Sequence, residues 1–180
     1  DDRCPITETR KLMLADEAFS PELWAEITEL GWPAILVPEA QGGLGLQWLE
    51  MAVLLEETGR TLAPSPLLAT ALATAAILDG GSESARDRWL PGIAAGKQTA
   101  TLALLDEVDA PEIASVTLQA EADGDGFRLS GMRDLILDAG QADLFVIAFR
   151  RPDESLQLAV VEKSLPGVSA CSFPTVDPSK

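Results

Sequence analysis

The sequence predicts an α+β protein, in which an amino-terminal all-helical domain is followed by an antiparallel β domain. Apolar residues recur at helical spacing from Ile6 to Ala95 and alternate at strand spacing after Lys97. Turn-forming Gly, Pro and Asp residues separate the later segments. Helices first and strands afterwards are typical of α+β proteins. We therefore expect a helical domain over residues 1–96 and an incomplete β-sheet domain over residues 97–180.

Capping and breaking residues divide the helical half. After a short segment that begins at Ile6, Ser20-Pro21 predicts a helix start, because serine caps helices and proline fits their first turn. Gly31 should end that helix. The later helices are expected from about Leu46 to Thr58 with Gly59 as the stop, from Pro66 to Leu78, and from Ser82 to a break at Pro91-Gly92. The 66–78 segment is apolar on nearly all sides, which predicts a buried helix.

The second half reads as six short strands. Their expected ranges are 98–105, 115–121, 127–130, 135–137, 144–149 and 156–161. The run from Asp123 to Gly126 predicts a tight hairpin turn, and the run from Pro152 to Ser155 predicts another turn. These turns favour an antiparallel arrangement.

Composition excludes several classes of function. A formal net charge of -16 argues against nucleic-acid binding, which needs a basic surface. The chain has no histidine, which excludes serine-histidine-aspartate and histidine-zinc chemistry. Cys4 and Cys171 have no metal-ligand spacing, so we expect two free thiols, Cys171 as a small buried residue. With no apolar run of membrane-spanning length, a cytoplasmic location is expected.

Four polar motifs have both a functional and a structural interpretation. The loop Gly42–Gly45 before a helix is either a phosphate site or a plain turn, and Glu56-Glu57 is either a catalytic pair or a solvated helix face. Arg86 and Arg88 meet either the phosphate of an anionic ligand or local carboxylates, and the Asp123 turn forms either a calcium loop or a hairpin. The four tryptophans are expected to pack as core or edge residues. The structural interpretation is favoured in each case, and no metal site is predicted.

Several segments together resemble the acyl-CoA dehydrogenase family, in that family's order and spacing. They are Leu30-Gly31-Trp32, the run from Val37 to Leu46, the run from Glu56 to Arg60, the run from Leu90 to Lys97, the run from Gly124 to Gly131, and the run from Ala139 to Asp143. The resemblance extends over essentially the whole chain. It is therefore more specific than any one motif.

The resemblance implies a fold, a cofactor and a reaction. Members of the family have a helical domain, a β domain and a second helical bundle, and they usually assemble as tetramers. FAD lies against the β domain and accepts hydride from the β-carbon of an acyl-CoA thioester, while a glutamate removes the α-proton. That glutamate is expected beyond Lys180, so no catalytic residue is assigned here. The implied function is α,β-dehydrogenation of acyl-CoA by an oligomeric cytoplasmic oxidoreductase of lipid metabolism, in fatty acid or steroid degradation.

The positions that the resemblance assigns to the flavin carry apolar residues. They are Leu102, Leu104, Leu105, Leu135, Ile136 and Leu137. Leu105 and Leu137 stand where the family has hydroxyl side chains, and Leu135 stands where it has tryptophan. Loss of a hydrogen bond to a desolvated cofactor atom costs about 1 to 3 kcal/mol, so FAD binding should be weakened or lost.

Two other functions stay open on the same residues. The leucines resemble the non-catalytic structural subunit of heteromeric family members, in which two related subunits share the cofactor and substrate sites. The second open function is a flavin-dependent oxidase or monooxygenase, because proteins with the same fold can catalyse different reactions.

Overall fold

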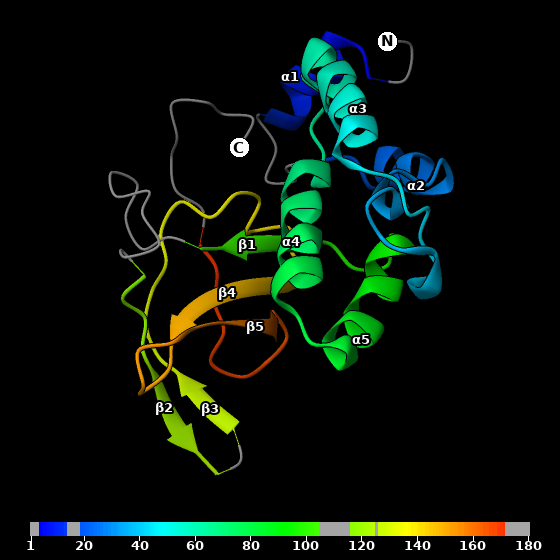
Figure 1. Cartoon of the computed structure of the whole chain (residues 1–180). Coiled ribbons are helices and arrows are strands. Elements are labelled where there is room, and N and C mark those ends of the chain that lie inside the picture. The colour runs from blue at the N-terminus through cyan, green and yellow to red at the C-terminus, as the bar shows by residue number, and fades with distance from the viewer. Residues whose placement is uncertain (1–3, 14–18, 105–115, 125, 172–180) are drawn as a thin grey trace.

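The computed structural model describes residues 4–13, 19–104, 116–124 and 126–171 (Figure 1). The helices are α1 Ile6–Met13, α2 Pro21–Glu29, α3 Trp48–Thr61, α4 Leu67–Gly80 and α5 Glu83–Ala94, with short 3-10 helices at Trp32–Ala34 and Glu39–Gln41. The strands are β1 Ala100–Ala103, β2 Ala120–Asp123, β3 Gly126–Leu129, β4 Leu144–Arg150 and β5 Leu156–Glu162. The α+β class is confirmed, with the helices before the strands. No helix within the described ranges is long and apolar enough to cross a membrane.

The predicted helix starts are confirmed. The Ser20 hydroxyl accepts a hydrogen bond from the Leu23 amide at 3.2 Å, and the Ser82 hydroxyl accepts one from the Ala85 amide at 3.2 Å. Each serine satisfies an amide that has no partner inside its own helix. Gly31, with a φ of 77°, follows the end of α2 as expected.

Two predicted helix ends are wrong. Helix α3 continues through Gly59 to Thr61 and ends at Leu62, which itself takes a left-handed φ of 50°. Helix α5 continues through Pro91 to Ala94. Pro91 lies on the exposed face of its last turns, whereas Leu90 and Ile93 on the other face are fully buried. Their burial outweighs the loss of one backbone hydrogen bond at the proline.

The strands form two sheets rather than one antiparallel array. In the larger sheet the order is β1-β4-β5, with β1 parallel to β4 and β5 antiparallel to β4. Strands β2 and β3 form a separate antiparallel hairpin, which confirms the turn predicted at residues 123–126. The parallel pair was not predicted, because strand spacing in a sequence carries no information on direction.

Two strand predictions need correction. The segment predicted at 115–121 enters the hairpin only at Ala120, and its first residue lies outside the described range. Residues 135–137 are not a strand, because Leu135 has a left-handed φ of 53° that no strand permits. This segment instead crosses irregularly from the hairpin to β4.

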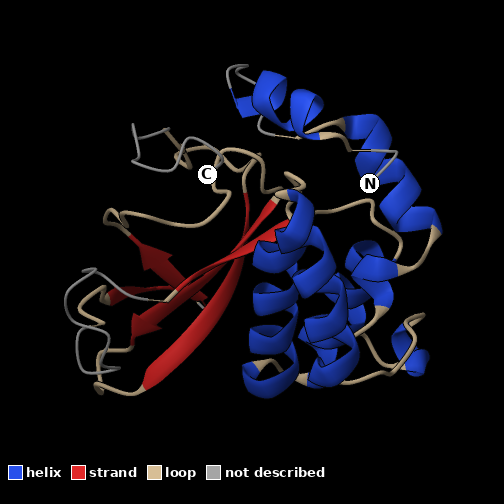
Figure 2. Cartoon of the chain, turned by 90° about the horizontal axis from the view of Figure 1, so that it is seen from above, coloured by secondary structure: helices blue, strands red, loops and turns tan. Residues whose placement is uncertain are grey.

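Two buried clusters hold the fold together. The first lies between α4, α5 and one face of the larger sheet, and it includes Ile77, Leu90, Ile93, Leu144 and Val146. The second joins α2, α3 and the start of α4 around Trp24, Ile27, Ile35, Met51 and Leu67. The helices gather on one side of the sheet (Figure 2). Helix α4 belongs to both clusters, which explains why it is apolar on nearly all sides.

Helix α4 also bonds directly to the sheet. The buried amide of Ala100, at the start of β1, donates to the Thr70 hydroxyl at 3.2 Å. The division into domains at residues 96 and 97 stays a prediction, and this bond crosses it.

Candidate functional site

The assigned flavin-facing segments meet at one edge of the larger sheet. Strand β1 carries Leu102 and leads to Leu104, and the segment between β3 and β4 carries the other three described positions. The Thr101 hydroxyl donates to the Leu137 carbonyl oxygen at 2.6 Å, so the two segments are in direct contact. Thr101 is fully buried, whereas Leu137 is half-buried. The fold thus brings together residues 36 positions apart.

Further hydrogen bonds fix the 131–143 segment against the strands. The Arg133 guanidinium donates to the Ala148 carbonyl of β4 at 2.7 Å, and desolvation by burial lowers its pKa. Lys163, just after β5, donates to the Gly140 carbonyl at 2.6 Å. The Thr99 hydroxyl donates to the Gln141 carbonyl at 2.8 Å. Residues before, within and after the sheet therefore all hold this segment.

Leu135 and Asp138 both have a φ of 53°. Left-handed backbone is uncommon outside glycine and is less tolerated by leucine than by aspartate. Residues in such conformations cost about 1 to 3 kcal/mol each and often lie at ligand sites. The conformation of Leu135 is therefore one that its surroundings impose.

The assigned leucines do not form one apolar floor. Leu102 is half-buried and packs against the core beneath α4 and α5, and Leu104 is half-buried at the end of the strand. Leu135 is 61% exposed, whereas Ile136 and Leu137 are half-buried. Leu105 lies outside the described residues. The assignment of these six positions to the cofactor stays a prediction.

A flavin ring would find apolar contact here and little polar contact. The side chains at 135–137 carry no hydrogen-bonding atom. The Thr101 hydroxyl is already engaged, because it donates to the Leu137 carbonyl. The side chains at 135–137 would therefore offer a ring apolar contact, and hydrogen bonds to the ring would have to come from backbone groups or from other residues. Thr101 and Arg133 were missed because a single threonine or arginine that bonds to a backbone carbonyl has no characteristic spacing in a sequence.

The glycine loop is a structural turn, as predicted. The amides of Gly43, Leu44 and Gly45 donate to backbone carbonyls of the preceding segment at 3.1, 2.9 and 2.8 Å. They are therefore not directed toward an external anion. Among the described residues, no cluster of metal-ligating side chains occurs.

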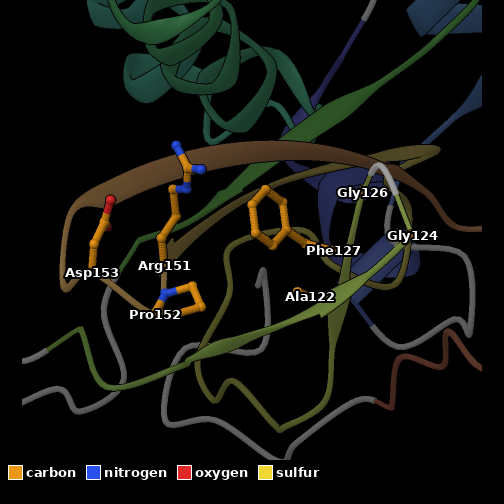
Figure 3. A pocket seen from close by; sticks show the side chains of 7 residues that line it. All are labelled: Ala122, Gly124, Gly126, Phe127, Arg151, Pro152 and Asp153. Atoms are coloured by element: carbon orange, nitrogen blue, oxygen red, sulfur yellow. The ribbon is translucent and has the colours of Figure 1, made fainter.

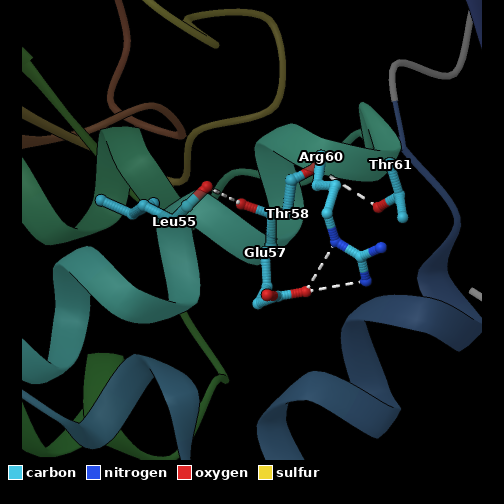
Figure 4. A network of polar contacts seen from close by, with 5 residues as sticks. All are labelled: Leu55, Glu57, Thr58, Arg60 and Thr61. Atoms are coloured by element: carbon cyan, nitrogen blue, oxygen red, sulfur yellow. Dashed lines mark hydrogen bonds and ion pairs between the residues drawn. The ribbon is translucent and has the colours of Figure 1, made fainter.

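The charged motifs also take structural roles. Glu57 pairs with Arg60 at 2.9 Å on the exposed face of α3 (Figure 4), which fits a solvated helix face. Arg88 pairs with Glu162 of β5 at 3.4 Å, a carboxylate that is distant in sequence rather than local. Asp123 pairs with Arg128 within the hairpin at 2.8 Å. These exposed pairs contribute little stability.

The expectation for one thiol is wrong. Cys171 is exposed, whereas Cys4 is buried, and both are free. Among the tryptophans, Trp24 and Trp89 are buried as predicted, and Trp48 is 45% exposed at the start of α3.

Two surface hollows lie away from the assigned positions. One, of about 330 Å³, lies between the hairpin and the β4–β5 turn and is lined by Phe127, Arg151 and Asp153 among others (Figure 3). The Arg151 guanidinium stacks over the Phe127 ring at 5.1 Å. The other, of about 500 Å³, lies between the start of α3 and the end of α4. Neither hollow includes an assigned flavin-facing residue.

Comparison with known proteins gives consistent matches. A family model for the N-terminal domain of acyl-CoA dehydrogenases matches residues 5–97. The (2S)-methylsuccinyl-CoA dehydrogenase of Cereibacter sphaeroides is 29% identical over 169 residues, covering 90% of this chain and 31% of that protein. Acyl-CoA dehydrogenase FadE27 of Mycobacterium tuberculosis is 28% identical over 173 residues, covering 96% of this chain and 45% of that protein.

Solved structures agree in fold. A variant of the Tcur3481-Tcur3483 steroid ACAD has a TM-score of 0.82 and 34% identity, covering 92% of this chain and 45% of that chain. The ChsE4-ChsE5 complex from Mycobacterium tuberculosis has a TM-score of 0.82 and 27% identity, covering 94% of this chain and 45% of the matched chain. The chain therefore spans less than half the length of these four proteins.

Proposed function

The chain belongs to the acyl-CoA dehydrogenase family, and we propose that it is part of a flavoprotein that introduces an α,β double bond into an acyl-CoA thioester. The observation that carries this proposal is the contact between the end of β1 and the 135–138 turn, joined by Thr101 and Leu137. These are the two segments that the family resemblance assigns to the flavin. They lie 36 positions apart in sequence and meet only in the fold.

FAD, when bound, would supply the acceptor for the hydride that leaves the β-carbon, while the α-proton would leave to a base. In this proposal the described residues support and orient the ring, and none of them is assigned as the base. A neighbour of 34% identity is described as a steroid ACAD, which supports lipid or steroid acyl thioesters as the substrate class.

Visible absorption of the full-length protein tests the proposal. We expect a flavin spectrum that is bleached when an acyl-CoA of suitable chain is added without oxygen. A series of fatty and steroid acyl-CoA esters would identify the chain that reduces the flavin fastest. A flavin that stays oxidised with every ester would contradict dehydrogenation. Rapid reoxidation by oxygen in each turnover would favour an oxidase.

A second candidate is a structural subunit that completes a partner's active site. The specific observation for it is that Leu135, Ile136 and Leu137 offer no side-chain hydrogen bond. One solved relative is a complex of two named components, ChsE4 and ChsE5. Helix α3 also carries Leu49 at 73% and Val53 at 55% exposure, an apolar face that supports association with another chain. Flavin bound only after mixing with a related subunit would favour this candidate.

The leucine positions can be tested by replacement. Leu105→Thr, Leu135→Trp and Leu137→Thr together in the full-length protein should tighten FAD binding, because each hydroxyl would regain a bond of about 0.5 to 1.5 kcal/mol. Calorimetric titration measures the change, and circular dichroism checks the fold. Unchanged or weaker affinity with the fold intact would show that these leucines do not face the flavin.

A further inference from the structure

The segment between β3 and β4 contains a leucine in a backbone conformation that leucine does not favour. Leu135 and Asp138 both take a φ of 53°, and the Leu137 carbonyl lies between them in sequence. Leucine has no short polar side chain that could stabilise left-handed backbone locally. The shape must therefore be enforced by contacts with the rest of the fold.

The other left-handed residues with side chains in the described part of the chain have ordinary explanations. Leu62 follows the last turn of α3, where helices commonly end in this conformation. Glu154 lies in the tight turn between β4 and β5. Asp138 lies in a hydrogen-bonded turn, in which the Ala139 amide donates to the Ile136 carbonyl, and aspartate tolerates this conformation. Leu135 lies neither at a helix end nor in such a turn. The left-handed conformation of Leu135 therefore needs an explanation other than a helix end or a tight turn.

Two side chains, the fully buried Thr101 and the half-buried Arg133, join this segment to the sheet by hydrogen bonds. Thr101 of β1 donates to the Leu137 carbonyl at 2.6 Å, inside the strained stretch. Arg133, which is two residues before Leu135, donates to the Ala148 carbonyl of β4 at 2.7 Å. Strands β1 and β4 are paired with each other. Both hydrogen bonds therefore attach this segment to the same sheet. Thr101 and Ala148 are fully buried, whereas their partners Leu137 and Arg133 are half-buried.

We propose that Thr101 and Arg133 are positioning residues that hold the 135–138 turn in one geometry for the flavin. They act through the turn and need not touch the ring. The inference rests on the proposed function for its ligand, and on the two hydrogen bonds for its mechanism. It also explains how a turn with apolar side chains keeps a defined orientation, since the backbone is fixed by the sheet behind it.

The test uses Thr101→Val in the full-length protein, with Thr101→Ser as the conservative variant that keeps the hydroxyl. Valine has nearly the same shape, so the packing is retained while the Leu137 carbonyl loses its donor. Thr74→Val is the matched control, because Thr74 is also a buried threonine and its hydroxyl bonds within its own helix, to the Thr70 carbonyl at 2.8 Å. Amide hydrogen exchange over residues 135–139 and FAD affinity are measured for each variant.

We expect Thr101→Val to speed amide exchange in the turn, to weaken FAD binding about tenfold, and to shift the visible flavin band. A tenfold change corresponds to about 1.4 kcal/mol. Thr101→Ser should restore the wild-type values within about twofold, and Thr74→Val should leave both measurements unchanged. Arg133→Met is a second variant, with faster exchange expected at the start of the same segment.

The outcomes separate this inference from the proposed function. Unchanged exchange in both the Thr101→Val and Arg133→Met variants would overturn the inference, whatever the flavin does. Faster exchange with unchanged FAD affinity would show a structural bond and overturn the positioning role. If the wild-type protein binds no FAD, alone or with a related subunit, the proposed function fails and the positioning role fails with it. The exchange data would then still report whether the sheet imposes the turn.

Discussion

The bond between Thr70 and Ala100 gives a sharp test of how the helices hold the sheet. Thr70 lies on α4 and is 1% exposed, and its hydroxyl accepts the Ala100 amide at 3.2 Å. Ala100 is also 1% exposed, so a Thr70→Val change leaves a buried amide that water does not reach. An unsatisfied buried donor costs about 1 to 3 kcal/mol.

Thr74, one turn further along α4, provides the comparison. It is also 1% exposed, and its hydroxyl bonds to the Thr70 carbonyl at 2.8 Å. That carbonyl keeps its place in the backbone ladder of the helix when the hydroxyl is lost. Thr74→Val should therefore cost less than about 1 kcal/mol, although the chemical change is the same.

Urea unfolding followed by tryptophan fluorescence measures both variants, and thermal unfolding gives an independent value. For Thr70→Val we expect a loss of about 2 kcal/mol and a melting temperature lower by about 4 to 8 °C in a chain of this size. The difference between the two variants is the decisive quantity, because helix propensity and side-chain volume change equally in both. Equal losses within about 0.3 kcal/mol would refute the reasoning.

Two further predictions concern the glycine loop and the β4–β5 turn. Gly43→Ala should prevent folding or destabilise strongly, because its new Cβ would lie 1.9 Å from the Val37 carbonyl oxygen. Gly42→Ala has open space at a φ of 82° and should cost only about 1 kcal/mol; similar unfolding curves for the two would contradict this. Hydrogen bonds from the Ser155 hydroxyl and amide lower the pKa of Asp153, so this carboxylate stabilises the fold above its unfolded pKa and loses that contribution as pH falls through the lowered value. Ser155→Ala should raise the Asp153 pKa toward its ordinary value in an NMR titration, and an unchanged titration would count against the bond.

The sequence alone was sufficient where the relevant interactions are local. Ser20 and Ser82 identified helix starts, because a capping serine bonds to an amide three residues away. The hairpin turn at residues 123–126 followed from turn chemistry within four residues. The ordered family motifs, each a short run, were likewise enough to predict the family and the α+β class.

Local signals failed where burial elsewhere decided the outcome. Pro91 did not break α5, because Leu90 and Ile93 on its inner face pack into the core. Cys171 was expected to be buried, and hydrophobicity alone did not reveal that its segment lies on the surface.

The sequence by itself determined which segments form helices, where most of them begin, and which family the chain resembles. Only the tertiary structure decided that β1 runs parallel to β4 and that the 135–138 turn is not a strand. It also decided that Leu102 faces the helices while Leu135 faces outward. The physical reason is distance along the chain: the Thr101–Leu137 bond joins residues 36 positions apart, and no local pattern specifies such a pairing.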